Sequence, residues 1–450
     1  MSTSGVRRRL RGWAANPTQY ANALRHGEGA PAGRSSWTAL FALCLGNAVQ
    51  WYDFALYGAF ATVIGPLFFP ARNSSTVMLA AFATYGIALV VRPIGALLFG
   101  RMADLRGRRA VFVLIILIMA GATATVGLLP GYAVIGVLAP VTLILLRAVQ
   151  GLAAGGELGV AGVLILEGAP RRRWGQMGSW HTSTLALGLG FGMGVASVLL
   201  LIESSDPSQA GWWRLAFLLA LPLGLIGGLV RRRVSETSQF LAASQAGQTV
   251  RQPIPRLWGH HRMALLRGFA LIAAGSLAFN TFFIFMPNHL AATRKLDLPS
   301  TLLLSAAALV VTAIAAVALG RLSDIVGRRP VAIWSNLALA VLAIPMSLLA
   351  GTSQTGLLLA QLIMGAALAG VLLVAMVGEL FPTSLRATGM AMTAGLATAL
   401  VGGTAPAVDQ ILVTALNLDA APGGYLSVVA CLALFALWRW PETTFKPVIE

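Results

Sequence analysis

Two ten-residue stretches decide the fold of this chain: GRMADLRGRR at 100–109 and GRLSDIVGRR at 320–329. Both follow the pattern G-R-x-x-D-x-x-G-R-R, and the second begins 220 residues after the first. A second pair repeats in the same order, because LEGAPRRRWG at 166–175 and GELFPTSLRATG at 378–389 each contain an acid, a proline and arginine. Matched features at similar offsets indicate that one structural unit is duplicated.

The composition excludes an ordinary soluble domain. Hydrophobic residues make up 57% of the 450 residues and charged residues only 10%, whereas soluble proteins carry about 25% charged residues. The net charge of +17 could suggest nucleic acid, but the charges punctuate long apolar runs, which is typical of membrane topology. The two cysteines, Cys44 and Cys431, allow neither a disulfide scaffold nor a cysteine-based metal site.

The apolar runs predict an all-α membrane protein. A membrane-spanning helix needs about 20 largely apolar residues. Twelve segments meet this requirement: 37–64, 77–99, 110–129, 134–166, 177–201, 212–230, 264–287, 300–319, 331–350, 355–378, 388–412 and 423–440. The glycines of the fifth segment, at 188, 190, 192 and 194, predict close approach of neighbouring helices.

The basic loops give the orientation and the domain organisation. Loops rich in arginine occur at every second connection, which places both termini in the cytoplasm. We therefore expect two pseudo-symmetric six-helix bundles in the inner membrane. The expected parts are a cytoplasmic tail at 1–36, bundles at 37–230 and 264–440, a cytoplasmic linker at 231–263 and a tail at 441–450.

The repeated loops also predict a cytoplasmic gate. Asp104 and Asp324 can accept hydrogen bonds from the free N–H groups at a neighbouring helix start, and the arginines can pair with acids on other loops. The predicted gate comprises Asp104, Arg108, Arg109, Glu167, Glu236, Asp324, Arg328, Arg329, Glu379, Arg386 and Glu442. In the alternative interpretation, the arginines only set topology, which would not require the repeated aspartate and glycine spacing.

Ionisable residues inside the apolar segments are candidates for function, because burying them costs several kcal/mol unless they are paired or solvated. They are Asp53, Arg92, Arg147, Glu157 and His181, with Asp409 nearer the outer end of its segment. Two polar stripes follow helical spacing: Asn47, Gln50, Asp53 and Tyr57 in one segment, and Arg147, Gln150, Ala154 and Glu157 in another. Each stripe occupies one helix face, and we expect both to line a water-filled path.

Roles follow from the chemistry of these groups. Asp53 and Glu157 are the predicted proton carriers, because burial raises the pKa of a carboxyl group and a nearby arginine lowers it. Arg147 and Arg92 are fixed cations that can pair an anionic substrate bidentately. Further predicted substrate-binding residues are Gln50, Tyr57, Gln150, His181 and Asn280.

Structural alternatives stay open for several of these residues. Arg92, near the cytoplasmic end of its helix, could snorkel or serve the loop network. Glu157 could pair with a loop arginine, and His181 could be an interfacial histidine. Asp53 and Arg147 could form a purely structural pair.

The chain resembles the major facilitator superfamily, and more narrowly its metabolite:proton symporter family. Besides the doubled loop motif, the resemblance rests on GNAVQWYDFALYGAFATVIGPLFFP (46–70), RPIGALLFGRMADLRGRR (92–109), LLRAVQGLAAGGELGVAGVLILEGAP (145–170) and GLATALVGGTAPAV (395–408). It implies a twelve-helix fold of two bundles, a central cavity that opens alternately to each side, and proton-driven uptake of a small metabolite.

The expected substrate is a small organic anion, a di- or tricarboxylate such as citrate. GLATALVGGTAPAV, with AAPGGYLSVVA at 420–430, looks most like the citrate and tricarballylate members, and intramembrane arginines suit anions. The osmolyte carriers of this family often have a long C-terminal coiled coil, whereas this chain ends soon after its last segment. Alternatives are symport of proline, betaine or an aromatic acid, proton-driven efflux, and a transporter-like sensor.

Other function classes are not indicated. The sequence contains no nucleotide-binding loop, no metal-ligand cluster and no nucleophile–base constellation. We expect no enzymatic activity, cofactor, metal, ATP or nucleic acid, and a transporter that functions as a monomer with the lipid bilayer, protons and its substrate as partners.

Overall fold

Helices make up all the regular structure in the part of the chain that the structure describes. The computed structural model describes residues 34–70, 73–106, 108–167, 169–205, 211–232, 257–259, 261–371, 374–382, 385–438, 440 and 442, and these ranges contain no strand. Within them, nine helices are long and apolar enough to cross a membrane, and two shorter apolar helices cover Val113–Leu128 and Trp213–Leu229. With α3 (Arg34–Ala59), they account for the twelve predicted segments.

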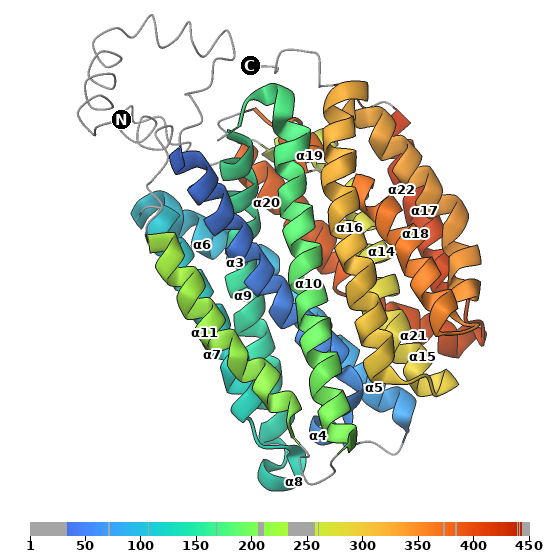
Figure 1. Ribbon diagram of the computed structural model, residues 1–450. Coiled ribbons are helices and arrows are strands. Elements are labelled where there is room, and N and C mark those ends of the chain that lie inside the picture. The colour runs from blue at the N-terminus through green and yellow to red at the C-terminus, as the bar shows by residue number, and fades with distance from the viewer. Residues whose placement is uncertain are drawn as a thin grey trace, which may run out of the picture.

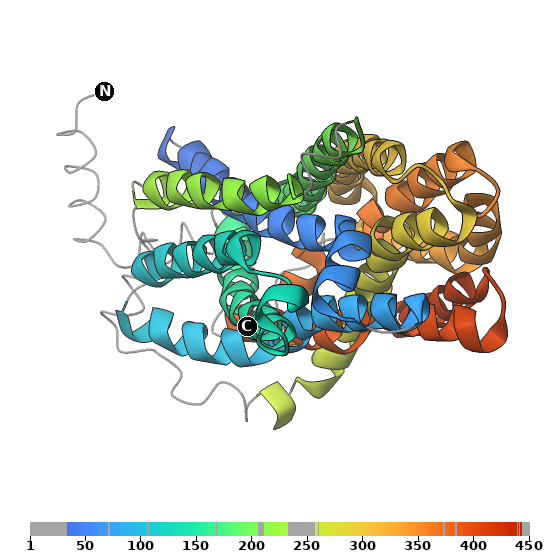
Figure 2. The ribbon, with the colours of Figure 1, turned by 90° about the horizontal axis from the view of Figure 1, so that it is seen from below.

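The first half of the chain forms one side of the molecule (Figures 1 and 2). After α3, its elements are α4 (Ala61–Phe68), α5 (Ser74–Val90), α6 (Arg92–Arg106), α7 (Arg108–Leu128), α8 (Tyr132–Ile135), α9 (Leu138–Glu167), the short helix η1 (Arg171–Arg173), α10 (Trp174–Ser205) and α11 (Trp213–Arg232). The predicted linker at 231–263 lies mostly outside the described residues.

The second half forms the other side. Its elements are α14 (Arg262–Phe279), η3 (Asn280–Phe285), α15 (Met286–Arg294), α16 (Leu298–Val326), α17 (Arg328–Ala350), α18 (Gln354–Val371), α19 (Val374–Gly378), α20 (Arg386–Ala397), η4 (Thr398–Gly402), α21 (Ala405–Leu416) and α22 (Ala421–Trp438). We call the end with the α6–α7 and α16–α17 loops the basic end, and the end with α4, α8 and α15 the opposite end.

Several predicted segments are broken within the bundle. The first segment breaks between α3 and α4 at Phe60, and the second breaks between α5 and α6 at Val91. The seventh and eleventh segments contain the π-helical stretches η3 and η4. Such stretches widen the helix locally and are frequent at functional sites. η3 contacts α3 and η4 contacts α5, so these two stretches lie where the two halves meet.

Glycines let helices from both halves approach α10. A Cβ atom at Gly188 would collide with the Ala48 carbonyl of α3, and one at Gly190 would lie 3.2 Å from the Ala306 carbonyl oxygen of α16. These contacts confirm the close approach predicted from the glycine spacing. Gly194 differs, because a Cβ atom there would meet nothing within 4 Å.

The turn between α16 and α17 explains part of the repeated motif. Gly327 ends α16 with a φ of 105°, a conformation that L side chains rarely adopt. The chain therefore reverses tightly here, and Arg328 begins the next helix directly.

Candidate functional site

A buried polar cluster joins α3, α7 and α9. Nη1 of Arg147 donates to Oδ2 of Asp53 at 3.2 Å and to Oε1 of Gln150 at 2.8 Å. Nε2 of Gln150 donates to Oδ1 of Asp53 at 2.8 Å, and the Thr123 hydroxyl donates to the same oxygen at 2.7 Å. The exposed fractions of the Arg147 and Asp53 side chains are 0% and 2%. Three donors thus hold one carboxylate away from solvent.

Thr123 is a member of this cluster that the sequence analysis missed. It lies in α7, in an apolar stretch where a threonine can also bond to its own helix. Its hydroxyl also accepts a hydrogen bond from Gln150 at 2.8 Å. Helical spacing predicts neighbours within one helix, but α7 reaches this cluster only through tertiary packing.

Aromatic rings surround both intramembrane arginines. The Arg147 guanidinium carbon lies 4.3 Å from the Tyr57 ring centre and 5.1 Å from that of Phe54. The guanidinium carbon of Arg92 lies 4.6 Å from the Phe54 ring centre and 5.4 Å from that of Trp51. Phe54 is therefore close to both cations. Stacking of this kind is favourable, and more so where water is excluded.

Arg92 lies at the break within its segment. It begins α6, which runs on to Arg106. Its side chain is fully buried, and its guanidinium group lies over the Trp51 and Phe54 rings of α3. A charged group buried in this way does not snorkel to the interface in this structure.

The polar stripe of α3 contacts both α10 and the polar cluster. Asn47 donates to the His181 carbonyl oxygen and to the Thr184 hydroxyl, both at 2.9 Å, and so binds α10. Gln50 is also buried. Asp53 faces the cluster described above. The stripe was expected to line a water-filled path, but none of Gln50, Asp53, Arg147 and Gln150 is among the residues lining the cavity described next.

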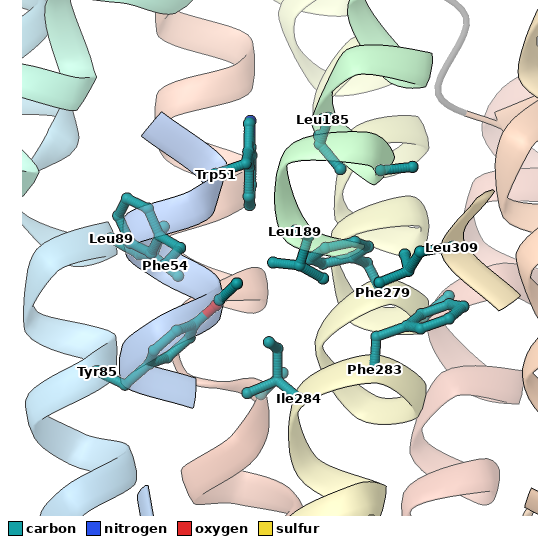
Figure 3. Close-up of a cluster of buried hydrophobic side chains, with 14 of the residues drawn as sticks. Trp51, Phe54, Tyr85, Leu89, Leu185, Leu189, Phe279, Phe283, Ile284 and Leu309 are labelled. Carbon is teal, nitrogen blue, oxygen red and sulfur yellow. The ribbon is translucent and has the colours of Figure 1, made fainter. Parts of the chain in front are cut away.

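A cavity of about 90 Å³ lies between the two halves. It is lined by Trp51, Leu89, Gly162, His181, Thr182, Leu185, Ile272, Ser276, Phe279, Asn280, Val371, Val374, Val377, Met390, Ala394, Thr398 and Gly402. Figure 3 shows several of these side chains converging from both halves, with Trp51 facing Phe279. The two rings meet edge to face, with centroids 5.5 Å apart. The described lining contains no Arg, Lys, Asp or Glu.

Two predicted substrate-binding residues line this cavity. His181 is 7% exposed at one wall, and Asn280 is 4% exposed at another. The Asn280 side chain accepts a hydrogen bond from the Tyr85 hydroxyl at 2.9 Å and donates to the Ser276 carbonyl at 2.8 Å. Tyr85 belongs to the first half and its ring lies near Arg147, so one hydrogen bond links the polar cluster with the cavity wall. Thr182 and Trp51 are lining residues that the sequence analysis did not propose.

Loop residues of the basic end meet as a network. Oδ1 and Oδ2 of Asp324, at the end of α16, accept hydrogen bonds from the backbone N–H groups of Gly175 and Gln176, both at 2.8 Å. These N–H groups belong to the first turn of α10, so the contact joins the two halves. Arg328 lies 3.3 Å from Asp324 and 3.2 Å from Glu379. Asp324 thus accepts the kind of helix-start bonds predicted for it.

Other predicted gate residues contact both halves. The guanidinium carbon of Arg386 lies 5.2 Å from the ring centre of Trp174 in α10, and Nη2 of Arg328 donates to the Arg171 carbonyl at 3.4 Å. The backbone N–H groups of Arg328 and Arg329 donate to Glu442 at 3.2 and 3.1 Å. Nε of Arg386 donates to the Gly378 carbonyl at 3.0 Å. The side chains of Glu157 and of the gate residues Asp104, Arg108, Arg109 and Glu167 lie outside the described residues, as does the whole of Glu236.

Comparisons with known proteins agree with this architecture. Residues 38–249 match the family described as sugar (and other) transporter, and residues 269–449 match the Major Facilitator Superfamily. The partially occluded, inward-open xylose transporter XylE from E. coli superposes with a TM-score of 0.71 at 19% identity, over 92% of this chain and 100% of that one. That likeness concerns the fold.

Curated relatives cover nearly the whole chain. The proline/betaine transporter of Salmonella typhimurium is 32% identical over 91% of this chain and 84% of its own length. The glycine betaine/proline/ectoine/pipecolic acid transporter OusA of Dickeya dadantii has the same identity and the same coverage. The alpha-ketoglutarate permease of Escherichia coli is 31% identical over 89% of this chain and 92% of its length. The chain is a multi-pass membrane transporter, and it belongs to the major facilitator superfamily.

Proposed function

We propose that this chain is a proton-coupled symporter of the inner membrane that imports a zwitterionic osmolyte such as proline or betaine. In this proposal it belongs to the metabolite:proton symporter family, both termini are cytoplasmic, and the basic end faces the cytoplasm in accordance with the positive-inside rule. The osmolyte was the alternative in the sequence analysis, and the proline/betaine relatives favour it over citrate.

The described lining of the central cavity, which contains no charged side chain, carries the choice of substrate. A tricarboxylate would place several negative charges in a cavity whose described walls contain no arginine or lysine, and unpaired charges are costly where water is excluded. A zwitterion has no net charge. Its ammonium group suits the faces of Trp51 and Phe279, and its carboxylate suits the polar side chains of His181, Thr182 and Asn280.

Proton coupling is proposed for Asp53. Its carboxylate is buried and paired with Arg147 at 3.2 Å. The carboxylate keeps its negative charge only while this ion pair is intact. If the α3–α9 contact loosens during the transport cycle, the arginine no longer offsets the burial, and the carboxyl group takes up a proton. Arg147 keeps its charge throughout.

The test is uptake into proteoliposomes that contain the purified protein, with an acidic outside and a panel of glycine betaine, proline, citrate and 2-oxoglutarate. We expect accumulation of betaine and proline that a protonophore abolishes. Accumulation of citrate without betaine would overturn the substrate assignment. Accumulation that persists after the proton gradient is dissipated would overturn the coupling.

Organic-anion symport is the second candidate. It is favoured by the buried guanidinium group of Arg92 beside Trp51 of the cavity wall, by that of Arg147 beside Tyr85, which hydrogen-bonds to the lining residue Asn280, and by the alpha-ketoglutarate permease among the relatives. In the same assay this candidate predicts uptake of 2-oxoglutarate.

A further inference from the structure

A buried carboxyl group in the second half has no role in the site described above. Asp409 lies in α21, close behind the break that separates η4 from α21, and it is 0% exposed. Oδ2 of Asp409 accepts a hydrogen bond from the Thr281 hydroxyl at 2.7 Å. Oδ1 of Asp409 is buried without a hydrogen-bond partner.

Among the described residues, no cation forms an ion pair with Asp409. The elements packed against α21 are η3, α5 and α22. Their titratable side chains are Tyr85 of α5 and Tyr425 and Cys431 of α22, none of which carries positive charge. His289, in α15, instead lies 3.8 Å from Asp419.

This setting distinguishes Asp409 from Asp53. The carboxylate of Asp53 is stabilised by an arginine and two uncharged donors, whereas Asp409 receives one hydroxyl donor. A carboxylate buried without a cation is strongly disfavoured, whereas the neutral acid leaves at most one polar hydrogen unsatisfied. The neutral, protonated acid is therefore the favoured form in this arrangement.

The surroundings of Asp409 belong to both halves of the molecule. Thr281 lies in the π-helical stretch η3 of the second half, whereas α5 of the first half covers α21. The contact is tight at the break, because a Cβ atom at Gly86 of α5 would lie 2.5 Å from the Gly403 carbonyl oxygen. Separation of the halves at the opposite end would lift α5 from α21 and let water reach Asp409.

We propose that Asp409 is a second proton-binding site, in the second half, which holds a proton while α5 covers it and exchanges that proton with water when the halves part. The proton bound to a carboxyl oxygen passes to water and leaves a carboxylate, which Thr281 still hydrogen-bonds. Asp409 takes its proton from water when the halves are parted at the opposite end, and it releases the proton toward the cavity, whose lining residue Asn280 adjoins Thr281, when the basic end is open. On this proposal, which rests on proton-coupled transport, each transport cycle moves one proton through Asp409 in addition to the one at Asp53.

The first experiment observes the proton directly and needs no substrate. The infrared band of protonated carboxyl groups is recorded for the full chain in lipid, for Asp409→Asn, and for Asp419→Asn, whose side chain is 38% exposed. Asp409→Asn is expected to remove one band that Asp419→Asn leaves unchanged. An unchanged band in Asp409→Asn overturns the proposal, whatever the protein transports.

The second experiment measures stoichiometry. The substrate gradient that just balances a known proton gradient gives the number of protons moved per substrate in proteoliposomes. Asp409→Asn is expected to lower this number by one and to keep substrate exchange. An unchanged number overturns the Asp409 site and leaves the proposed function intact, whereas a wild-type protein that moves no protons overturns the proposed function instead.

A third variant covers the case in which Asp409→Asn does not fold. Thr281→Val keeps the carboxyl group and removes the single hydrogen bond that favours its charged form. The pH at half-maximal exchange is expected to rise relative to wild type. An unchanged pH dependence in a folded Thr281→Val protein contradicts the proposal.

Discussion

The Asp53 carboxylate and the Arg147 guanidinium lie 3.2 Å apart although 94 residues separate them in the chain. The pair lies in the interior, where neither side chain is more than 2% exposed. An ion pair in such a place stabilises the fold only while both partners are present, because either charge alone is costly to bury. A change in one partner can therefore be transmitted to the other.

Replacing Asp53 by Asn should lower the proton coupling of transport. The amide fills the same space but takes up no proton, so the accumulation that a given proton gradient supports should fall while downhill exchange of substrate continues. Exchange and accumulation are measured in the same proteoliposomes. Asp419→Asn is the matched control, since that carboxylate is partly exposed. Accumulation at the wild-type level in Asp53→Asn would show that Asp53 carries no proton.

Removing Arg147 should destabilise the protein more than removing both partners. Arg147→Met leaves Asp53 buried and unpaired, and breaking a buried pair in this way costs about 3–5 kcal/mol. The double variant with Asp53→Asn should recover part of that loss. Thermal unfolding in detergent measures the stability of the Arg147→Met variant and of the double variant.

The exposed pair of Arg294 and Asp419 provides the control for that comparison. Its oxygen–nitrogen distance is 2.6 Å, and its side chains are 53% and 38% exposed. Surface ion pairs contribute about 0–1 kcal/mol, so Arg294→Met should have little effect. Equal losses of stability from Arg147→Met and Arg294→Met would contradict the argument that burial makes the Asp53–Arg147 pair important for stability.

Replacing Asp324 by Asn should favour opening at the basic end. An asparagine replaces one of the two accepting oxygens by an NH2 group, which cannot accept from Gly175 or Gln176, and it carries no charge toward the start of α10. Loss of about 1 kcal/mol corresponds to about a fivefold shift in the opening equilibrium. Alkylation of a cysteine introduced at Thr182 in the cavity wall, in a variant without the two native cysteines, measures this shift.

Asp297→Asn is the matched control for the gate. Asp297 also accepts a hydrogen bond from a helix-start N–H group, that of Ser300 at 2.9 Å, but within the second half and at the opposite end. The alkylation rate should remain at the wild-type value in Asp297→Asn. A rate that does not change in Asp324→Asn either would show that this contact does not hold the basic end closed.

The glycines of α10 should differ sharply in their tolerance to alanine. Gly188→Ala forces a Cβ atom into the backbone of α3 at Ala48, whereas Gly194→Ala meets open space. Overpacking of this kind costs about 1–3 kcal/mol, and the Gly194 variant should be neutral or slightly stabilised. Thermal unfolding measures the stability of the two variants. Equal stabilities would contradict the close contact between α10 and α3 at Gly188.

The aromatic ring of Trp51 in the cavity wall should strengthen the binding of a quaternary ammonium group. Trp51→Leu removes a ring face and should weaken betaine binding by about 1–2 kcal/mol, which is roughly five- to thirtyfold, whereas Trp51→Phe should retain part of the affinity. Equilibrium binding to the purified protein measures this. Trp438→Leu is the control because Trp438 is 76% exposed on α22. Unchanged affinity in Trp51→Leu would remove the main physical argument for a zwitterion.

Local spacing predicted those parts of the site that one helix contains. Arg147 and Gln150 share a face because they are three residues apart, and they hydrogen-bond in the structure. Apolar length gave the twelve segments in the same way, since the bilayer sets how long a helix must be. The repeated motif located the turn at Gly327 because a tight reversal requires the conformational freedom of glycine.

Only the tertiary structure decided which segments meet and what lines the cavity. Thr123 joins Asp53 because α7 packs beside α3 and α9, and Arg92 stacks on Phe54 because its helix is broken at Val91. The charges along the chain suggested an anion site, but packing places Arg92 and Arg147 beside aromatic rings, and the described residues that line the cavity between the halves carry no charged side chain. A pattern along one chain records which face of each helix is polar, whereas the partner of that face is set by the packing of all the helices together.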